Sequence, residues 1–132
     1  MSQTLEQKRA KYALDVITKA KENDREKNGE GYGRHVRKLP AMILNNGLGQ
    51  ALAFLLADGK EPSKKVYEDM QEWLRGESKV DRPRRIYAGS DELIKLLMGG
   101  NRSQYLQAQD ETLKLLTWMK KFADAYLPKS GS

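Results

Sequence analysis

Only one histidine, His35, is available for acid–base chemistry in this 132-residue chain. It lies in a basic run beside Arg34 and Arg37, and no carboxylate nearby in the sequence could orient its imidazole as a general base. We therefore expect His35 to be a surface or helix-capping residue. The chain has no cysteine, which excludes disulfides, zinc ribbons, iron–sulfur clusters and thiol nucleophiles.

Three carboxylates, those of Glu68, Asp69 and Glu72, form an acidic cluster. Glu68 and Glu72 are four residues apart, so on a helix they share a face and could hold a hard cation such as Mg²⁺. Asp110 and Glu111 are adjacent and diverge on a helix, and no second pair completes a site. We interpret the acidic cluster as a solvated helix face and expect no metal, no cofactor and no catalytic residue. A small nuclease that uses this cluster is the enzymatic alternative.

The basic residues are unevenly distributed along the chain. Lys and Arg number 24 against 18 Asp and Glu, a formal charge of +6. Residues 32–57 contain three basic residues and no acid, and residues 77–90 contain four basic residues against two acids. Because arginine suits bidentate phosphate contacts, we predict that two clusters bind RNA phosphates. Their members are Arg34, Arg37 and Lys38, and Arg82, Arg84 and Arg85.

Helices must position these residues, because apolar side chains recur every three or four positions and no alternating stretch of strand length occurs. We predict helices over 5–27, 33–38, 40–57, 63–75, 91–98 and 103–126. A capping box of Thr4 and Gln7 begins the first helix, Ser63 and Ser90 cap the fourth and fifth, and Gly76 ends the fourth. We expect the Trp and Tyr side chains to be core residues rather than base-stacking platforms. The prediction is a compact all-α bundle of about six helices forming a single domain over 1–132, with 1–3 and 128–132 mobile.

An uncharged stretch covers residues 39–57 and is apolar on nearly every side. It is almost as long as a bilayer span, but Pro40, Asn45, Asn46 and two glycines lie within it, so we expect a buried central helix and no membrane contact. The usual reason for glycines at 47 and 49 is the close approach of another helix. The polar N-terminus does not resemble a signal peptide, and we expect a cytoplasmic protein.

The segment 32–55, YGRHVRKLPAMILNNGLGQALAFL, resembles the signature of the small subunit of the type III-B CRISPR effector, the Cmr complex. The run 102–127 resembles the C-terminal half of that family, and the N-terminal stretch 9–13 also fits. The residues that carry the match in the later run are Tyr105, Leu106, Ala108, Glu111, Leu115, Leu116, Trp118 and Lys120 to Ala123. Residues 60–90 are not distinctive, and the role of that region stays open.

The resemblance implies a small all-α, non-catalytic subunit of a crRNA-guided ribonucleoprotein that cleaves target RNA in antiviral defence. Its implied partners are the backbone subunit, the large polymerase-like subunit, the crRNA and the target RNA, and copies of itself in a minor filament along the guide–target duplex. Cleavage is attributed in that family to the backbone subunits. A free-standing nucleic-acid-binding protein is the alternative function outside such a complex.

Overall fold

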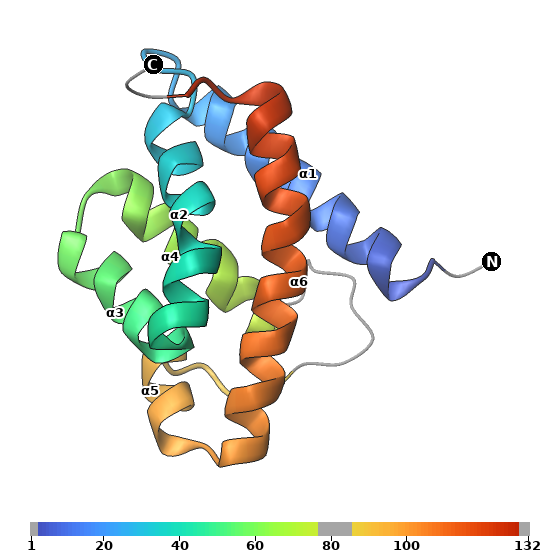
Figure 1. Ribbon diagram of the computed structural model, residues 1–132, viewed down its shortest axis with the longest axis vertical. Coiled ribbons are helices and arrows are strands. Elements are labelled where there is room, and N and C mark those ends of the chain that lie inside the picture. The colour runs from blue at the N-terminus through green and yellow to red at the C-terminus, as the bar shows by residue number, and fades with distance from the viewer. Residues whose placement is uncertain (1–2, 77–85, 130–132) are drawn as a thin grey trace.

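The structure is a computed structural model that describes residues 3–76 and 86–129. Within these ranges it contains six α-helices and no strand, as Figure 1 shows, which confirms the predicted all-α fold. The helices are α1 (Leu5–Asn23), α2 (Glu30–Asn46), α3 (Leu48–Asp58), α4 (Glu61–Arg75), α5 (Leu93–Gly99) and α6 (Arg102–Tyr126).

Local capping signals set several of the helix ends. The Thr4 and Gln7 capping box begins α1 as predicted, and Gly76 ends α4 in the left-handed conformation. The predicted extension of the first helix to residue 27 is wrong, because α1 ends at Asn23. Its buried apolar stripe stops at Ala20, and beyond that point no core contact compensates the cost of ordering the chain.

The predicted helix break at Pro40 is wrong. Helix α2 continues through Pro40, because a proline removes one backbone hydrogen bond while Val36, Leu39 and Ile43 remain packed in the core on either side of it. The chain turns instead at Gly47, whose φ of 88° disfavours any residue with a Cβ and whose N–H returns to the Ile43 carbonyl at 2.7 Å. Two helices therefore occupy the stretch that the sequence suggested was one.

The first turn of α3 has no side-chain cap of its own and is capped by α6. The backbone N–H of Leu48 donates to Gln109 Oε1 at 2.9 Å, and that of Gly49 donates to the Tyr105 hydroxyl at 2.9 Å. A Cβ at Gly47 would lie 3.0 Å from the same hydroxyl. The expectation that another helix closely approaches these glycines is confirmed.

The core lies where α2 packs against α3, α4 and α6, while α1 lies along α6 (Figure 1). The uncharged stretch does not bury all its apolar side chains, because the turn at Gly47 leaves each of its two helices with an outer side. Leu44 is 71 % exposed, and Phe54 and Leu56 are also exposed. Over the described part of the chain, no helix is both long and apolar enough to span a membrane.

The two predicted serine caps are wrong. Helix α4 begins at Glu61 with Lys60 as its N-cap, and Ser63 lies inside its first turn, fully buried. Helix α5 begins at Leu93 with Glu92 as its N-cap rather than at Ser90. The Ser63 hydroxyl binds the side chains of His35 and Asp58 instead of a backbone N–H of the first turn.

Candidate nucleic-acid interface

The first predicted basic cluster lies on the outer side of α2. Lys38 is exposed, and Arg34 and Arg37 are partly exposed. Arg34 lies 4.0 Å from Glu30, one turn earlier on the same helix. The second predicted cluster, Arg82, Arg84 and Arg85, lies outside the described residues, and its role stays a prediction.

Arg37 is bound to the C-terminal end of α6. Its Nε donates to Asp124 Oδ1 at 2.8 Å, and its Nη2 donates to the carbonyls of Ala123 at 2.9 Å and Leu127 at 3.2 Å. The Ala123 carbonyl also accepts from the Leu127 N–H at 2.9 Å, so the guanidinium adds a second donor there and gives the Leu127 carbonyl, just beyond the helix, a donor from α2. The Arg37 charge also holds the pKa of Asp124 below its ordinary value. Arg37 therefore joins α2 to α6.

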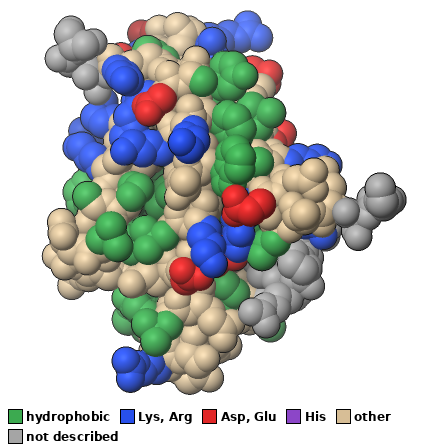
Figure 2. Space-filling model, turned by 45° about the vertical axis from the view of Figure 1, so that its right-hand side comes forward, with side chains coloured by type: hydrophobic (Ala, Val, Ile, Leu, Met, Phe, Trp, Pro, Cys, Tyr) green, Lys and Arg blue, Asp and Glu red, His purple; other side chains and the backbone are tan. Residues whose placement is uncertain are grey.

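Other basic residues join this cluster from distant parts of the chain. Lys60, at the start of α4, contributes with Arg34 and Lys38 to the electrostatic field at His35. Lys120 and Lys129 contribute in the same way at Asp124, the α6 residue that Arg37 binds. We call this set the basic α2 surface; its members are Arg34, Arg37, Lys38, Lys60, Lys120 and Lys129. In Figure 2, Lys and Arg side chains gather in the upper left part of the picture.

The prediction of His35 as a surface or capping residue is wrong. His35 is 6 % exposed, and its Nε2 lies 3.0 Å from the Ser63 hydroxyl. Ser63 donates to Asp58 Oδ2, and that carboxylate lies 3.8 Å from His35 Nε2. The carboxylate absent from the neighbouring sequence is therefore supplied from the end of α3. Burial lowers the pKa of His35, and the charges of the basic α2 surface lower it further, while Asp58 opposes them.

The histidine, serine and aspartate do not form a catalytic triad. In a triad the carboxylate orients the imidazole, and the imidazole activates an accessible hydroxyl. Here both Nε2 of His35 and the carboxylate of Asp58 meet at Ser63 Oγ, and Ser63 is fully buried. His35 Nδ1 is buried without a hydrogen-bond partner. The cluster joins α2 to the α3–α4 turn.

The acidic cluster is divided between solvent and core. Glu68 is exposed and lies 3.9 Å from Lys65, whereas Asp69 accepts a 2.6 Å hydrogen bond from the Tyr32 hydroxyl. Burial raises the pKa of Asp69 to about 6. Among residues 3–76 and 86–129, no group of three His, Cys, Asp or Glu side chains could hold a metal ion.

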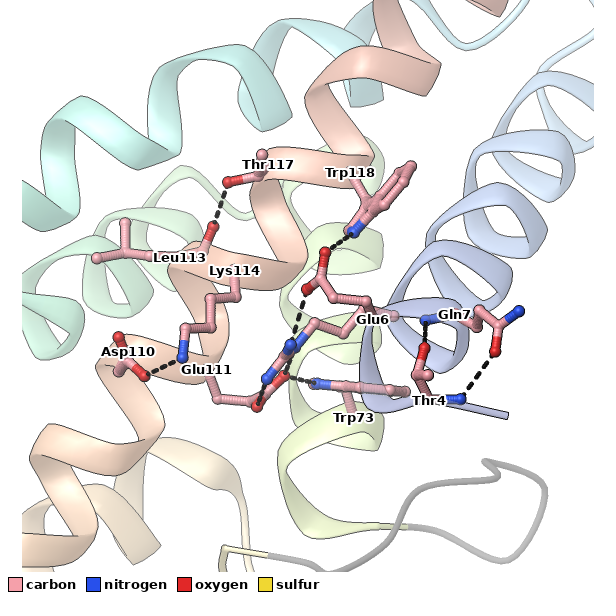
Figure 3. Close-up of polar contacts among 11 residues, drawn as sticks. Thr4, Glu6, Gln7, Trp73, Asp110, Glu111, Leu113, Lys114, Thr117 and Trp118 are labelled. Atoms are coloured by element: carbon pink, nitrogen blue, oxygen red, sulfur yellow. Dashed lines mark hydrogen bonds and ion pairs between the residues drawn. The ribbon is translucent and has the colours of Figure 1, made fainter. Parts of the chain in front are cut away.

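A polar network joins α1, α4 and α6 (Figure 3). Arg9 is 6 % exposed, and its guanidinium donates to both carboxylate oxygens of Glu111, at 2.7 and 2.8 Å. Glu111 also accepts from Trp73 Nε1 at 2.9 Å. Arg9 donates to Glu6 at 2.8 Å, and Trp118 Nε1 donates to the other oxygen of Glu6 at 3.1 Å. Sequence reasoning missed this network, although Arg9 and Glu111 both lie in the segments that carry the family resemblance.

Comparison with known proteins gives one consistent result. Residues 5–126 match the family model described as CRISPR-associated protein (Cas_Cmr5). The chain is 34 % identical over 102 residues to the CRISPR system Cmr subunit Cmr5 of Thermus thermophilus, which covers 75 % of this chain and 80 % of the relative. It also resembles the crystal structure of a CRISPR-associated Cmr5 family protein from the same organism, with a TM-score of 0.75 and 28 % identity, over 96 % of this chain and 100 % of that one.

Proposed function

The chain belongs to the Cmr5 family, the small subunit of the type III-B CRISPR effector known as the Cmr complex, and from this premise we propose that it is a non-catalytic subunit whose basic α2 surface faces the guide–target duplex. Its proposed partners are the backbone subunit, the large polymerase-like subunit, the crRNA, the target RNA and further copies of this chain. The observation that carries the proposal is that Arg34, Arg37 and Lys38 of α2 are joined by Lys60 near His35 and by Lys120 and Lys129 near Asp124.

Contacts from this surface would be to phosphates rather than to bases. Lys38, Lys60 and Lys120 are exposed ammonium groups on flexible stems, which bind phosphate as point charges and do not distinguish bases. Such binding releases counterions and weakens steeply as salt increases. A few contacts per copy give weak affinity alone and strong affinity when several copies lie side by side. This favours a subunit that acts within an assembly.

The non-catalytic role is supported by what surrounds the reactive side chains. The Ser63 hydroxyl is buried between His35 and Asp58, and Asp69 is hydrogen-bonded to Tyr32. Each of these groups has a structural partner that a catalytic role would have to displace.

Stacking of copies would use the exposed residues of the uncharged stretch 39–57, which lie in the C-terminal half of α2 and in α3. Its exposed members are Ala41, Leu44, Asn45, Asn46, Gln50, Ala53, Phe54, Leu56 and Ala57. Each copy carries a formal charge of +6, so a contact without charged groups avoids like-charge pairs across it. We expect Leu44→Glu to reduce self-association of the chain in sedimentation at high protein concentration, and Leu14→Glu, on the exposed side of α1, to leave it unchanged.

Reconstitution with the other subunits and a crRNA tests the RNA-facing surface. We expect the double variant Lys38→Glu/Lys60→Glu to assemble normally but to bind target RNA several-fold more weakly. Each phosphate interaction that the variant removes should also lower the slope of log affinity against log salt by roughly 0.7–0.9. Lys95→Glu on α5 is the matched control, because Lys95 is exposed and lies near Glu92 at the opposite end of the molecule.

The outcomes separate the parts of the proposal. Unchanged affinity and salt slope in Lys38→Glu/Lys60→Glu would exclude the basic α2 surface as the RNA-facing side. The same reversal at Arg82, Arg84 and Arg85 tests the second predicted cluster. A wild-type chain that does not assemble with the other subunits would refute the function itself and favour a free-standing nucleic-acid-binding protein.

A further inference from the structure

Three aromatic side chains form a row along the outer side of α6. Trp118, Phe122 and Tyr126 follow one another at intervals of four residues, which is about 6 Å along a helix. The ring centroids are 5.9 Å apart for the first pair and 6.4 Å apart for the second, with interplanar angles of 27° and 30°. The sequence predicted core positions for these rings; Trp118 and Phe122 are half-buried and pack against the core, whereas Tyr126 is 51 % exposed.

The polar network fixes one end of this aromatic row. The Trp118 Nε1 donates to Glu6, and Glu6 accepts from Arg9, which is itself bound to Glu111. The indole is therefore oriented before any ligand arrives. A ring held in this way loses little conformational freedom on binding.

Basic side chains accompany the aromatic row along the same side of α6. Lys114 lies four residues before Trp118 and Lys121 lies three after it, and i, i+3 and i+4 positions share a helix side. Both lysines are exposed. Figure 2 shows a column of hydrophobic side chains with Lys and Arg on its left and, below it, an acidic side chain followed by Lys and Arg.

Carboxylates near the aromatic row are already bound. Glu6 is engaged by Arg9 and Trp118, and Asp110 lies 3.0 Å from Lys114. The side thus combines exposed ring surface with the ammonium groups of Lys121 and of Lys114, which is paired with Asp110.

We propose that the aromatic row of Trp118, Phe122 and Tyr126 is a stacking platform for the unpaired bases of a single-stranded nucleic acid, with the lysines contacting its phosphates. Each nucleotide carries a base with an aromatic face and a charged phosphate. These two groups match the rings and the ammonium groups that lie along one helix. A duplex hides its base faces, so this platform would take a strand outside the guide–target duplex. The proposal extends the proposed function by adding a second kind of RNA contact, but its test does not depend on assembly of the complex.

Tryptophan fluorescence of the isolated chain tests the proposal directly. Of the two tryptophans, Trp73 is 1 % exposed, so a ligand-dependent change in emission reports Trp118. We expect short single strands of oligouridylate to quench the emission, and an abasic strand of equal length to leave it unchanged. The change should be absent in Trp118→Phe. A matching oligodeoxythymidylate shows whether the platform distinguishes RNA from DNA.

Affinity measurements on variants provide the second readout. Phe122→Leu and Tyr126→Leu should each weaken binding of the single strand about fivefold or more, because each removes one ring. Leu106→Ala is the matched control, since it removes an exposed apolar side chain without a ring from the same helix, and should bind as wild type. Circular dichroism of each variant checks that the fold is retained.

Several results would overturn the proposal. They are an unquenched Trp118 at saturating single strand, equal affinities for the aromatic-row variants and Leu106→Ala, or a loss of affinity in Lys121→Glu while none of the aromatic-row variants loses affinity, which would indicate charge without stacking. Quenching by the other subunits in the absence of RNA would make this side a protein contact instead. Each of these outcomes leaves the assignment to the effector complex intact, whereas failure to assemble leaves the fluorescence test unaffected.

Discussion

Replacing Glu111 by leucine should destabilise the protein more than its single carboxylate suggests. The change removes the two Glu111 oxygens that accept from the Arg9 guanidinium, one of which also accepts from the Trp73 indole. Arg9 then keeps only Glu6 while staying 6 % exposed. Leaving one partner of a buried ion pair uncompensated typically costs about 3–5 kcal/mol. For a chain of this length that corresponds to a fall in Tm of roughly 10–15 °C.

A double-mutant cycle isolates the coupling between the two charges. Arg9→Met alone should also cost about 3 kcal/mol, because it leaves the Glu111 carboxylate buried with only the Trp73 N–H as donor. The double variant Arg9→Met/Glu111→Leu should lie within about 1–2 kcal/mol of wild type, since neither buried charge is then present. The expected coupling free energy, which is the sum of the two single costs less that of the double variant, is therefore about 4–7 kcal/mol.

Urea unfolding followed by circular dichroism measures these free energies. The matched control is the Lys114 and Asp110 pair on the same helix, which has a similar separation of 3.0 Å but two largely exposed side chains. Asp110→Ala should change stability by about 0.5 kcal/mol or less. If Glu111→Leu cost no more than Asp110→Ala, or if the effects in the cycle were additive, the argument from burial would be refuted.

Three further changes test other parts of the structure. Gly47→Ala should destabilise the chain by about 1–2 kcal/mol in urea unfolding, because φ is 88° there. Burial lowers the pKa of His35, so as the pH falls below about 6.5 the unfolded state takes up the proton before the folded state does. Wild type should therefore lose stability below that pH. The variant His35→Gln, which has no imidazole to protonate, should not show this loss. Urea midpoints at pH 7.5 and 5 for both proteins measure the difference. Arg37→Ala should increase hydrogen exchange in the last turn of α6, whereas Lys38→Ala, one residue along, should not.

The helix ends show which signals can be interpreted locally. Thr4 with Gln7, and Gly76, act through residues within one turn, so their effects follow from the sequence. The break at Gly47 rather than Pro40 depends on packing, because contacts of the core residues on both sides of Pro40 outweigh one missing hydrogen bond. The cap on α3 comes from Tyr105 and Gln109, more than fifty residues away. No local pattern could have indicated it.

The candidate site divides in the same way. Arg34, Arg37 and Lys38 were identified from charge, but only the structure shows that Arg37 binds the end of α6. Lys60 was absent from the predicted cluster because its approach depends on the α3–α4 turn. The aromatic row was expected in the core because periodicity places its residues beside the apolar side of α6. The spacing of apolar residues along α6 does not indicate how much of this side is covered by α1.

The sequence by itself therefore determined the helical class, the uncharged stretch and the family resemblance. Each of these depends on residue types and on spacings of a few positions. The tertiary structure alone decided that His35 is buried with Ser63 and Asp58, that Arg9 binds Glu111, and which basic and aromatic side chains face solvent together. The physical reason is that burial and choice of partner are set by helices far apart in the chain that pack together, and a helical period identifies an apolar side without identifying what covers it.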